Sequence, residues 1–184
     1  MNLEQYVKNA IRTESTIDEI KLNKSYEFIQ ALNAFTAAAI LLDLFKKHIF
    51  YKKPINQEKW NYAVSLLCES SQNLQRSDHI HLEQLKTLKI DTRVFHGIVG
   101  IATEAGELIE TIIKQIDTNQ LDNINLAEEI GDVCWYQAIL VDTLKINWDT
   151  ILERNIAKLK VRYPEKYTDE NAINRNIEIE RKIL

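Results

Sequence analysis

Glycine and proline are scarce in this chain, and their scarcity limits the folds that it can adopt. Its 184 residues include only 4 glycines and 2 prolines, about 3% of the chain where roughly 12% is usual. Sandwiches, barrels and propellers need many tight turns, which these two residues commonly supply. Apolar residues recur instead at helical spacing along most of the chain. The sequence therefore predicts an all-α fold in a single domain, residues 1–184.

The apolar spacing divides the chain into several expected helices. Leu3–Ile11 is weakly amphipathic, and a capping box at Thr16–Glu19 predicts the start of a long helix that ends before Pro54. The polar segment 77–91 is expected to be an irregular connection, and no segment alternates clearly enough to predict a strand. Asn125 is expected to cap the helix that follows it. The remaining helices are expected over residues 57–76, 93–116, 126–144, 148–163 and 169–182.

Charge and cysteine content exclude some classes of function. The 23 basic residues against 27 acidic ones give a formal net charge of −4, which argues against a general nucleic-acid binder with a basic face. Cys68 and Cys134 form no CxxC pair and suit a reducing compartment. The longest uninterrupted apolar run, Ala37–Leu42, is too short for a membrane span. We therefore expect a cytoplasmic protein with neither a membrane nor a nucleic acid as its partner.

All four glycines lie near two acidic motifs. Glu104 and Glu107 are three positions apart, and so are Glu129 and Asp132, a spacing that makes each pair neighbours on a helix face. Two such pairs on facing helices would gather negative charges that only bound cations could neutralise. Carboxylate oxygens favour hard cations such as Mg²⁺ or Mn²⁺. The motifs thus predict metal-assisted chemistry on phosphate esters or anhydrides, with two solvated helix faces as the alternative.

The acidic motifs and their surroundings resemble a known family. The run FHGIVGIATEAGELIE over 95–110, followed by LAEEIGDVCWY over 126–136, is similar to the MazG-like all-α nucleoside triphosphate pyrophosphohydrolases, whose motif is ExxE followed by ExxD. The segments 155–167 and 6–15 resemble the closing and opening segments of family members. The resemblance covers 93–167 as a catalytic core and implies a helical bundle with two central antiparallel helices. Residues 16–92 would be an extra helical insertion of open function.

The resemblance implies an activity and a site. Family members cleave (d)NTPs to (d)NMPs and pyrophosphate with Mg²⁺, for which Mn²⁺ is a possible substitute, and they form homodimers or homotetramers. The implied metal ligands are Glu104, Glu107, Glu129 and Asp132. We expect Glu107 to be the catalytic residue that accepts the proton of the attacking water.

Three polar residues of a later helix are candidates for phosphate binding. Asn155, Lys158 and Arg162 share one helix face by their spacing, and they match positions at which the family contacts phosphates. The alternative is that the two cations only complement the helix dipole. Arg93 and His96, which precede the first acidic motif, are expected to edge a possible substrate cleft.

Other functions remain compatible with these residues. The same chemistry could act on a special substrate, such as an alarmone, dUTP or a modified nucleotide. A non-catalytic helical interaction module would keep the fold, although the acidic quartet is complete. A di-iron carboxylate bundle requires Glu-x-x-His pairs, and neither acidic motif has a histidine at that position.

Overall fold

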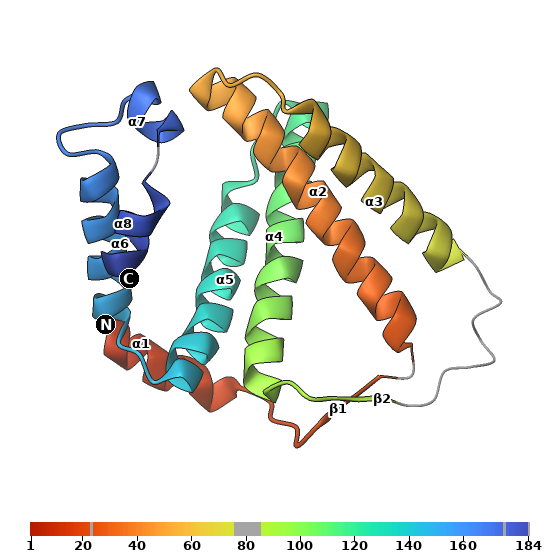
Figure 1. Cartoon of the computed structure of the whole chain (residues 1–184). Helices are drawn as coiled ribbons and strands as arrows, with labels where there is room; N and C mark the ends of the chain where they lie inside the picture. Colours follow the sequence, from red (N-terminus) through yellow and green to blue (C-terminus); the bar gives the residue numbers. More distant parts are fainter. Residues whose placement is uncertain (23, 76–85, 175, 184) are drawn as a thin grey trace. The chain divides into compact units, whose positions relative to one another are not determined.

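A computed structural model describes residues 1–22, 24–75, 86–174 and 176–183, and most of these residues are helical (Figure 1). The all-α prediction is confirmed. A 3-10 turn, η1, spans Ile11–Thr13, and two short strands, β1 (Ile20–Leu22) and β2 (Lys86–Leu88), pair in one small sheet. The helices are α1 (Leu3–Ala10), α2 (Ser25–Tyr51), α3 (Gln57–Gln75), α4 (Thr92–Thr118), α5 (Asn123–Leu144), α6 (Trp148–Arg162), α7 (Asp169–Ile173) and α8 (Ile177–Ile183).

The chain divides into two compact units. The first contains Met1–Ile20, Lys89–Glu165 and Asn176–Leu184, and both acidic motifs lie in it. The second contains Lys21–Leu88 and Lys166–Arg175. The second unit thus includes most of the segment 16–92 that the sequence marks as an addition to the core.

Helices α4 and α5 form the centre of the first unit, where they lie side by side (Figure 1). A Cβ atom at Gly97 would lie 2.6 Å from Leu140 Cγ, and one at Gly100 would lie 2.1 Å from the Tyr136 ring. Both glycines therefore allow α5 to approach α4 closely. Because the later residue of α4 meets the earlier residue of α5, the two helices run antiparallel.

The indole ring of Trp135, which is half-buried, joins α5 to the end of α1 by two hydrogen bonds. Trp135 Nε1 donates to Ala10 O at 3.1 Å and to Thr13 Oγ1 at 2.9 Å. These bonds satisfy the indole N–H where the N-terminal helix ends. The chain that leaves η1 is therefore positioned beside α4 and α5.

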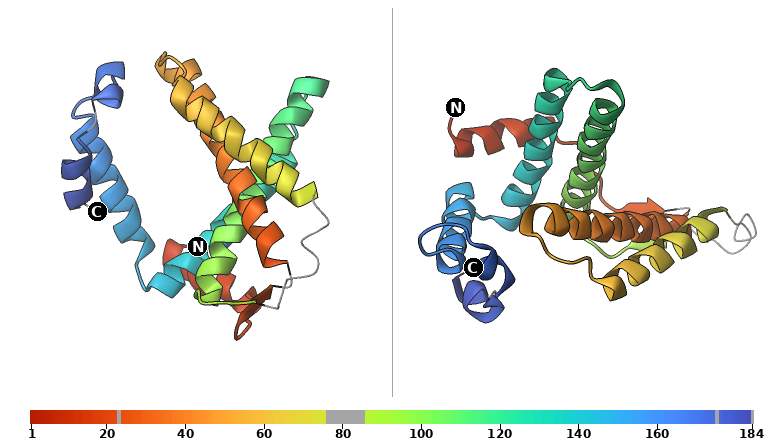
Figure 2. Two further views of the ribbon diagram at one scale, coloured as in Figure 1. Left: turned by 45° about the vertical axis from the view of Figure 1, so that its right-hand side comes forward. Right: turned by 90° about the horizontal axis from the view of Figure 1, so that it is seen from above.

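The largest part of the second unit is a helical hairpin of α2 and α3 (Figure 2), and α7 belongs to the same unit. Gln30, Ala37 and Leu44 are buried at seven-residue intervals along α2, a spacing typical of helices that pack along a seam. On α3, Ala63 and Ser70 are buried at the same interval. The hairpin thus has a regular interface made largely of small and aliphatic side chains.

Helix α2 is also long and apolar enough to cross a membrane, by length and composition only. Its qualifying window has a mean hydropathy of 1.7 and is 17% buried. Counting only uninterrupted apolar residues missed this property, because the uncharged side chains of Gln30, Asn33 and Thr36 break up a stretch that has no charged residue from 28 to 42. Core helices of soluble proteins can meet the same criteria.

Four expectations about local structure were wrong. No strand was expected, but β1 and β2 form a small sheet. The capping box at Thr16–Glu19 starts no helix: the chain enters β1 there, and α2 begins at Ser25, because β1 takes its hydrogen-bond partners from the distant strand β2. The cap of α5 is Asp122, whose carboxylate accepts from two backbone N–H groups, and not Asn125. The expected helix 169–182 is divided into α7 and α8. Most of the expected connection 77–91 lies outside the described residues.

Candidate active site

Three carboxylates from the two central helices meet at one point. Glu104 of α4 and Glu129 and Asp132 of α5 each place an oxygen within 4.8 Å of the others. Glu104 and Glu129 are buried, at 9% and 5% exposure, whereas Asp132 is exposed. We call this set the acidic cluster. It opens to solvent on the Asp132 side, from which a ligand can reach it.

The acidic cluster is electrostatically unfavourable without a cation. Burial and the nearby charge of Glu107 raise the pKa of Glu129 to about 7, and Glu104 and Asp132 add to the shift. Carboxylates that hold a proton to near neutral pH are repelling one another or lack solvation. A divalent cation would remove both penalties.

The donor set fits such a cation. Mg²⁺ prefers octahedral oxygen ligands at about 2.1 Å, so oxygens on opposite sides of the ion lie roughly 4 Å apart. Neighbouring ligands of such an ion lie only roughly 3 Å apart, so the oxygens of the acidic cluster, which lie within 4.8 Å of one another, must come closer together around the ion. Three carboxylates also leave positions open for water or a phosphate oxygen.

Glu107 lies outside the acidic cluster. Its side chain is exposed, and its effect within the site is the charge that raises the pKa of Glu129. The structure therefore brings together three of the four expected ligands and leaves the fourth nearby. The catalytic function assigned to Glu107 stays a prediction.

Two residues beside the acidic cluster were not singled out as site residues from the sequence. The Thr103 hydroxyl donates to Gly100 O at 2.8 Å and lies 3.3 Å from Glu104 Oε1. Burial, followed by the charges of Glu104 and the neighbouring acids, raises the pKa of Tyr136. Tyr136 follows Asp132 by four positions, so the helical repeat predicts its place on the same face.

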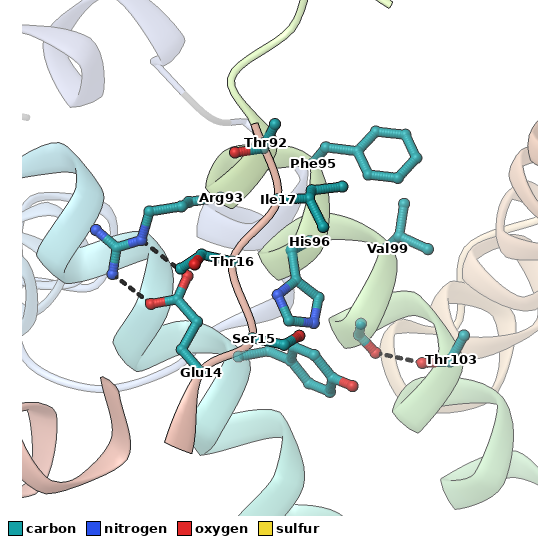
Figure 3. Close-up of a pocket in the computed structure, with 12 residues that line it drawn as sticks. Glu14, Ser15, Thr16, Ile17, Thr92, Arg93, Phe95, His96, Val99 and Thr103 are labelled. Atoms are coloured by element: carbon teal, nitrogen blue, oxygen red, sulfur yellow. Dashed lines mark hydrogen bonds and ion pairs between the residues drawn. The ribbon is translucent and has the colours of Figure 1, made fainter. Parts of the chain in front are cut away.

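Arg93 and His96 line one cavity of about 320 Å³ at the start of α4 (Figure 3). Arg93 donates from Nε and Nη2 to the two carboxylate oxygens of Glu14, at 2.8 and 2.7 Å, and from Nη1 to Asp142 Oδ2 at 2.7 Å. The hydrogen bond with Glu14 is the main cause of a raised Arg93 pKa. The guanidinium is thus committed to two carboxylates.

The three phosphate-binding candidates on α6 are in different environments. Arg162 donates from Nε to Glu180 Oε1 at 2.9 Å and forms an ion pair with the same carboxylate through Nη2. Lys158 is half-buried and Asn155 is exposed, and Lys158 forms no ion pair with another described residue. Helix α6 packs mainly against α8 and α1. The assignment of these residues to phosphate binding stays a prediction.

Comparison with known proteins agrees with this geometry. The family model of the MazG nucleotide pyrophosphohydrolase domain matches residues 98–167. Residues 98–167 are MazG-like. This segment includes the whole acidic cluster and α6, so the resemblance seen in the sequence is confirmed where the acidic motifs lie. Arg93 and His96 precede the matched residues.

One curated relative is a phage protein. The Gene 37 protein of Mycobacterium phage L5 is 35% identical over 68 residues, which are 36% of this chain. The chain spans about 60% of the length of that relative. No solved structure matches the chain significantly.

Proposed function

We propose that the chain hydrolyses nucleoside triphosphates to nucleoside monophosphates and pyrophosphate with the help of a divalent cation, Mg²⁺ or Mn²⁺. The observation that carries this proposal is the acidic cluster, which lies on the two helices of the MazG-like segment. Asp132 is exposed, which leaves room for a substrate phosphate.

In this proposal Glu104, Glu129 and Asp132 hold the cation, and Glu104 is oriented by the adjacent Thr103 hydroxyl. A cation bound there would polarise the α-phosphoryl group and neutralise charge as the bond to the leaving pyrophosphate breaks. Glu107 is exposed beside the acidic cluster and is the carboxylate free to accept a proton from the attacking water. The bond formed joins the water oxygen to the α-phosphorus, and pyrophosphate leaves.

The test is a turnover screen with the full chain. Canonical and damaged NTPs and dNTPs, dUTP and an alarmone are each incubated with Mg²⁺ or Mn²⁺, and pyrophosphate, monophosphate and inorganic phosphate are quantified. The proposal expects equal amounts of monophosphate and pyrophosphate from at least one nucleotide. Release of inorganic phosphate instead, or no turnover with either cation, would overturn it.

We also propose that the protein self-associates through α2. The face of α2 turned away from the α3 seam carries large side chains that are each about half exposed. They are Leu32, Phe35, Leu42 and Ile49, which follow one another at steps of three, seven and seven residues, as on one side of a packing seam. A two-fold dimer brings the same surface of two copies together, and an apolar helix face of this kind packs well against its own copy. A second α2–α3 hairpin is therefore the occupant that we propose.

Light scattering during gel filtration tests this association. Leu42→Glu should convert the oligomer to a smaller species, because it buries a charge in an apolar seam. Ser65→Glu, on an exposed position of α3, is the matched control and should leave the mass unchanged. A monomeric wild type, or a Leu42→Glu variant of unchanged mass, would contradict the proposal.

A further inference from the structure

We propose that the cavity at the start of α4 receives the nucleoside end of the substrate, and that Arg93 positions one wall of this cavity through Glu14. The proposal rests on the function proposed above. We call this cavity the α4 pocket. Its walls come from the segment 14–17, the first three turns of α4 and one side chain of α5, Tyr136.

The α4 pocket adjoins the acidic cluster along one helix. Thr103 lines the pocket, and its hydroxyl lies 3.3 Å from Glu104 Oε1. Tyr136 lines the pocket from α5, and charges of the acidic cluster raise its pKa. A substrate whose phosphates lie at the cluster can therefore extend directly into the pocket.

The walls suit a flat, uncharged ring system. The rings of His96 and Tyr136 stand edge to face, 5.5 Å apart at an interplanar angle of 78°, and Phe95 and Val99 add apolar surface. Aromatic and apolar walls with a few polar groups are typical of small-molecule sites. The volume of about 320 Å³ lies at the lower end of the ~300–1,000 Å³ range of such sites, which suits a nucleoside.

The charges around the α4 pocket indicate which end of the nucleotide it binds. Arg93 is the cation that lines the pocket, and the three described hydrogen bonds of its guanidinium go to the carboxylates of Glu14 and Asp142. A guanidinium already paired with two carboxylates offers little attraction to a triphosphate. The phosphates therefore belong at the acidic cluster, where a cation is needed, and the uncharged base and sugar belong in the pocket.

The pairing of Arg93 with Glu14 also fixes the segment that closes the pocket. Figure 3 shows the segment 14–17 running beside the first turns of α4, with Arg93 bonded to Glu14. The Glu14 carboxylate is 4% exposed. A buried carboxylate without its partner would be costly. Arg93 is thus a positioning residue, since it acts on the substrate through the backbone that Glu14 holds in place.

The first experiment blocks the pocket and measures binding of nucleoside monophosphates by calorimetry, with Mn²⁺ binding followed by electron paramagnetic resonance. Val99→Phe fills the pocket and should weaken monophosphate binding at least tenfold while Mn²⁺ affinity stays unchanged. Ile98→Phe, at the neighbouring exposed position outside the pocket, is the matched control and should bind like the wild type. Equal monophosphate affinities for the two variants would overturn the pocket assignment.

The second experiment separates positioning from stability. Arg93→Gln should raise KM for nucleotides about tenfold with a much smaller change in kcat, and Arg93→Lys, which keeps the charge, should restore part of the loss. A fall in kcat with KM unchanged, or no rescue by lysine, would overturn the positioning function. If the wild type hydrolyses no nucleotide, the proposed function fails by itself, and the monophosphate binding of Val99→Phe still decides the pocket.

Discussion

The surroundings of the Glu129 carboxyl raise its pKa well above the usual value for a glutamate. Its pKa in the folded protein is raised to about 7, first by burial and then by Glu107, whereas an unfolded chain holds a glutamate near about 4.3. Between these two values the folded state binds the proton more tightly. Stability from this group is therefore fully present below about pH 4 and is lost as the pH rises toward 7.

This difference predicts a pH dependence of stability in the metal-free protein. The melting temperature of the wild type in a chelator should fall between pH 5 and pH 7 relative to that of Glu129→Gln, which has no carboxyl to titrate. Calorimetry of both proteins across this range measures the difference. Parallel melting curves at every pH would contradict the raised pKa.

Lys158 and Arg162 are both cations of α6, but their surroundings predict different effects. Arg162 is paired with Glu180, which is almost fully buried, so Arg162→Ala should lower the free energy of unfolding by about 1–3 kcal/mol. Lys158→Ala should instead lower kcat/KM, by the equivalent of about 1–3 kcal/mol if its ammonium contacts phosphate. Denaturation and kinetics on both variants, with the exposed Lys160→Ala as control, check this. A loss of kcat/KM in Arg162→Ala without loss of stability would reverse the two assignments.

The glycines of α4 differ in how much space surrounds them, because only some of them face α5. A Cβ at Gly100 would lie 2.1 Å from the Tyr136 ring, whereas one at Gly106 meets nothing within 4 Å. Gly100→Ala should therefore lower the free energy of unfolding by about 1–3 kcal/mol through overpacking. Gly106→Ala should raise it by up to about 1 kcal/mol through helix propensity. Chemical denaturation of the two variants measures both signs, and a Gly100→Ala variant as stable as Gly106→Ala would show that the helices are less tightly packed.

The helices that pack through a continuous apolar face were predictable, and the segments that depend on distant partners were not. The apolar spacing places α3 at 57–76, and the structure has it at Gln57–Gln75. Thr16–Glu19 has the composition of a helix cap, but β1 pairs with a strand more than sixty residues later. The residues around Thr16–Glu19 alone do not predict a pairing with so distant a strand. Asp122 caps α5 three residues before the expected Asn125. The Asn125 side chain instead donates from Nδ2 to Thr111 Oγ1 of α4 at 3.0 Å, a partner that only the folded chain supplies.

The candidate site, like the fold, was predictable only as far as local spacing determines it. The spacing of the acids predicts which helix faces they share, and three of the four carboxylates do converge. The exposed position of Glu107 depends on how α4 is rotated against α5, which a single-helix pattern does not contain. The ion pair of Arg93 with Glu14 joins residues nearly eighty positions apart. Only the folded chain therefore shows that the Arg93 guanidinium is bonded to carboxylates of the protein itself.

At the scale of the whole molecule, the acidic cluster couples stability to cation binding. A cation that binds the folded protein and not the unfolded chain stabilises the fold by mass action, by about 2.7 kcal/mol at a concentration a hundred times its Kd. Millimolar Mg²⁺ or Mn²⁺ should therefore raise the melting temperature of the wild type, and less so that of Glu104→Gln. A melting temperature that changes with neither cation would contradict a preformed metal site.

The most direct test of the central claim compares product formation by matched carboxylate variants of one helix. Glu104→Gln removes a charge from the acidic cluster, and Glu110→Gln removes one from an exposed position six residues later on α4. With Mg²⁺ and the best nucleotide substrate, pyrophosphate release should be lost in Glu104→Gln and kept in Glu110→Gln, with both variants folded by circular dichroism. Pyrophosphate release by Glu104→Gln at the wild-type rate would contradict the account.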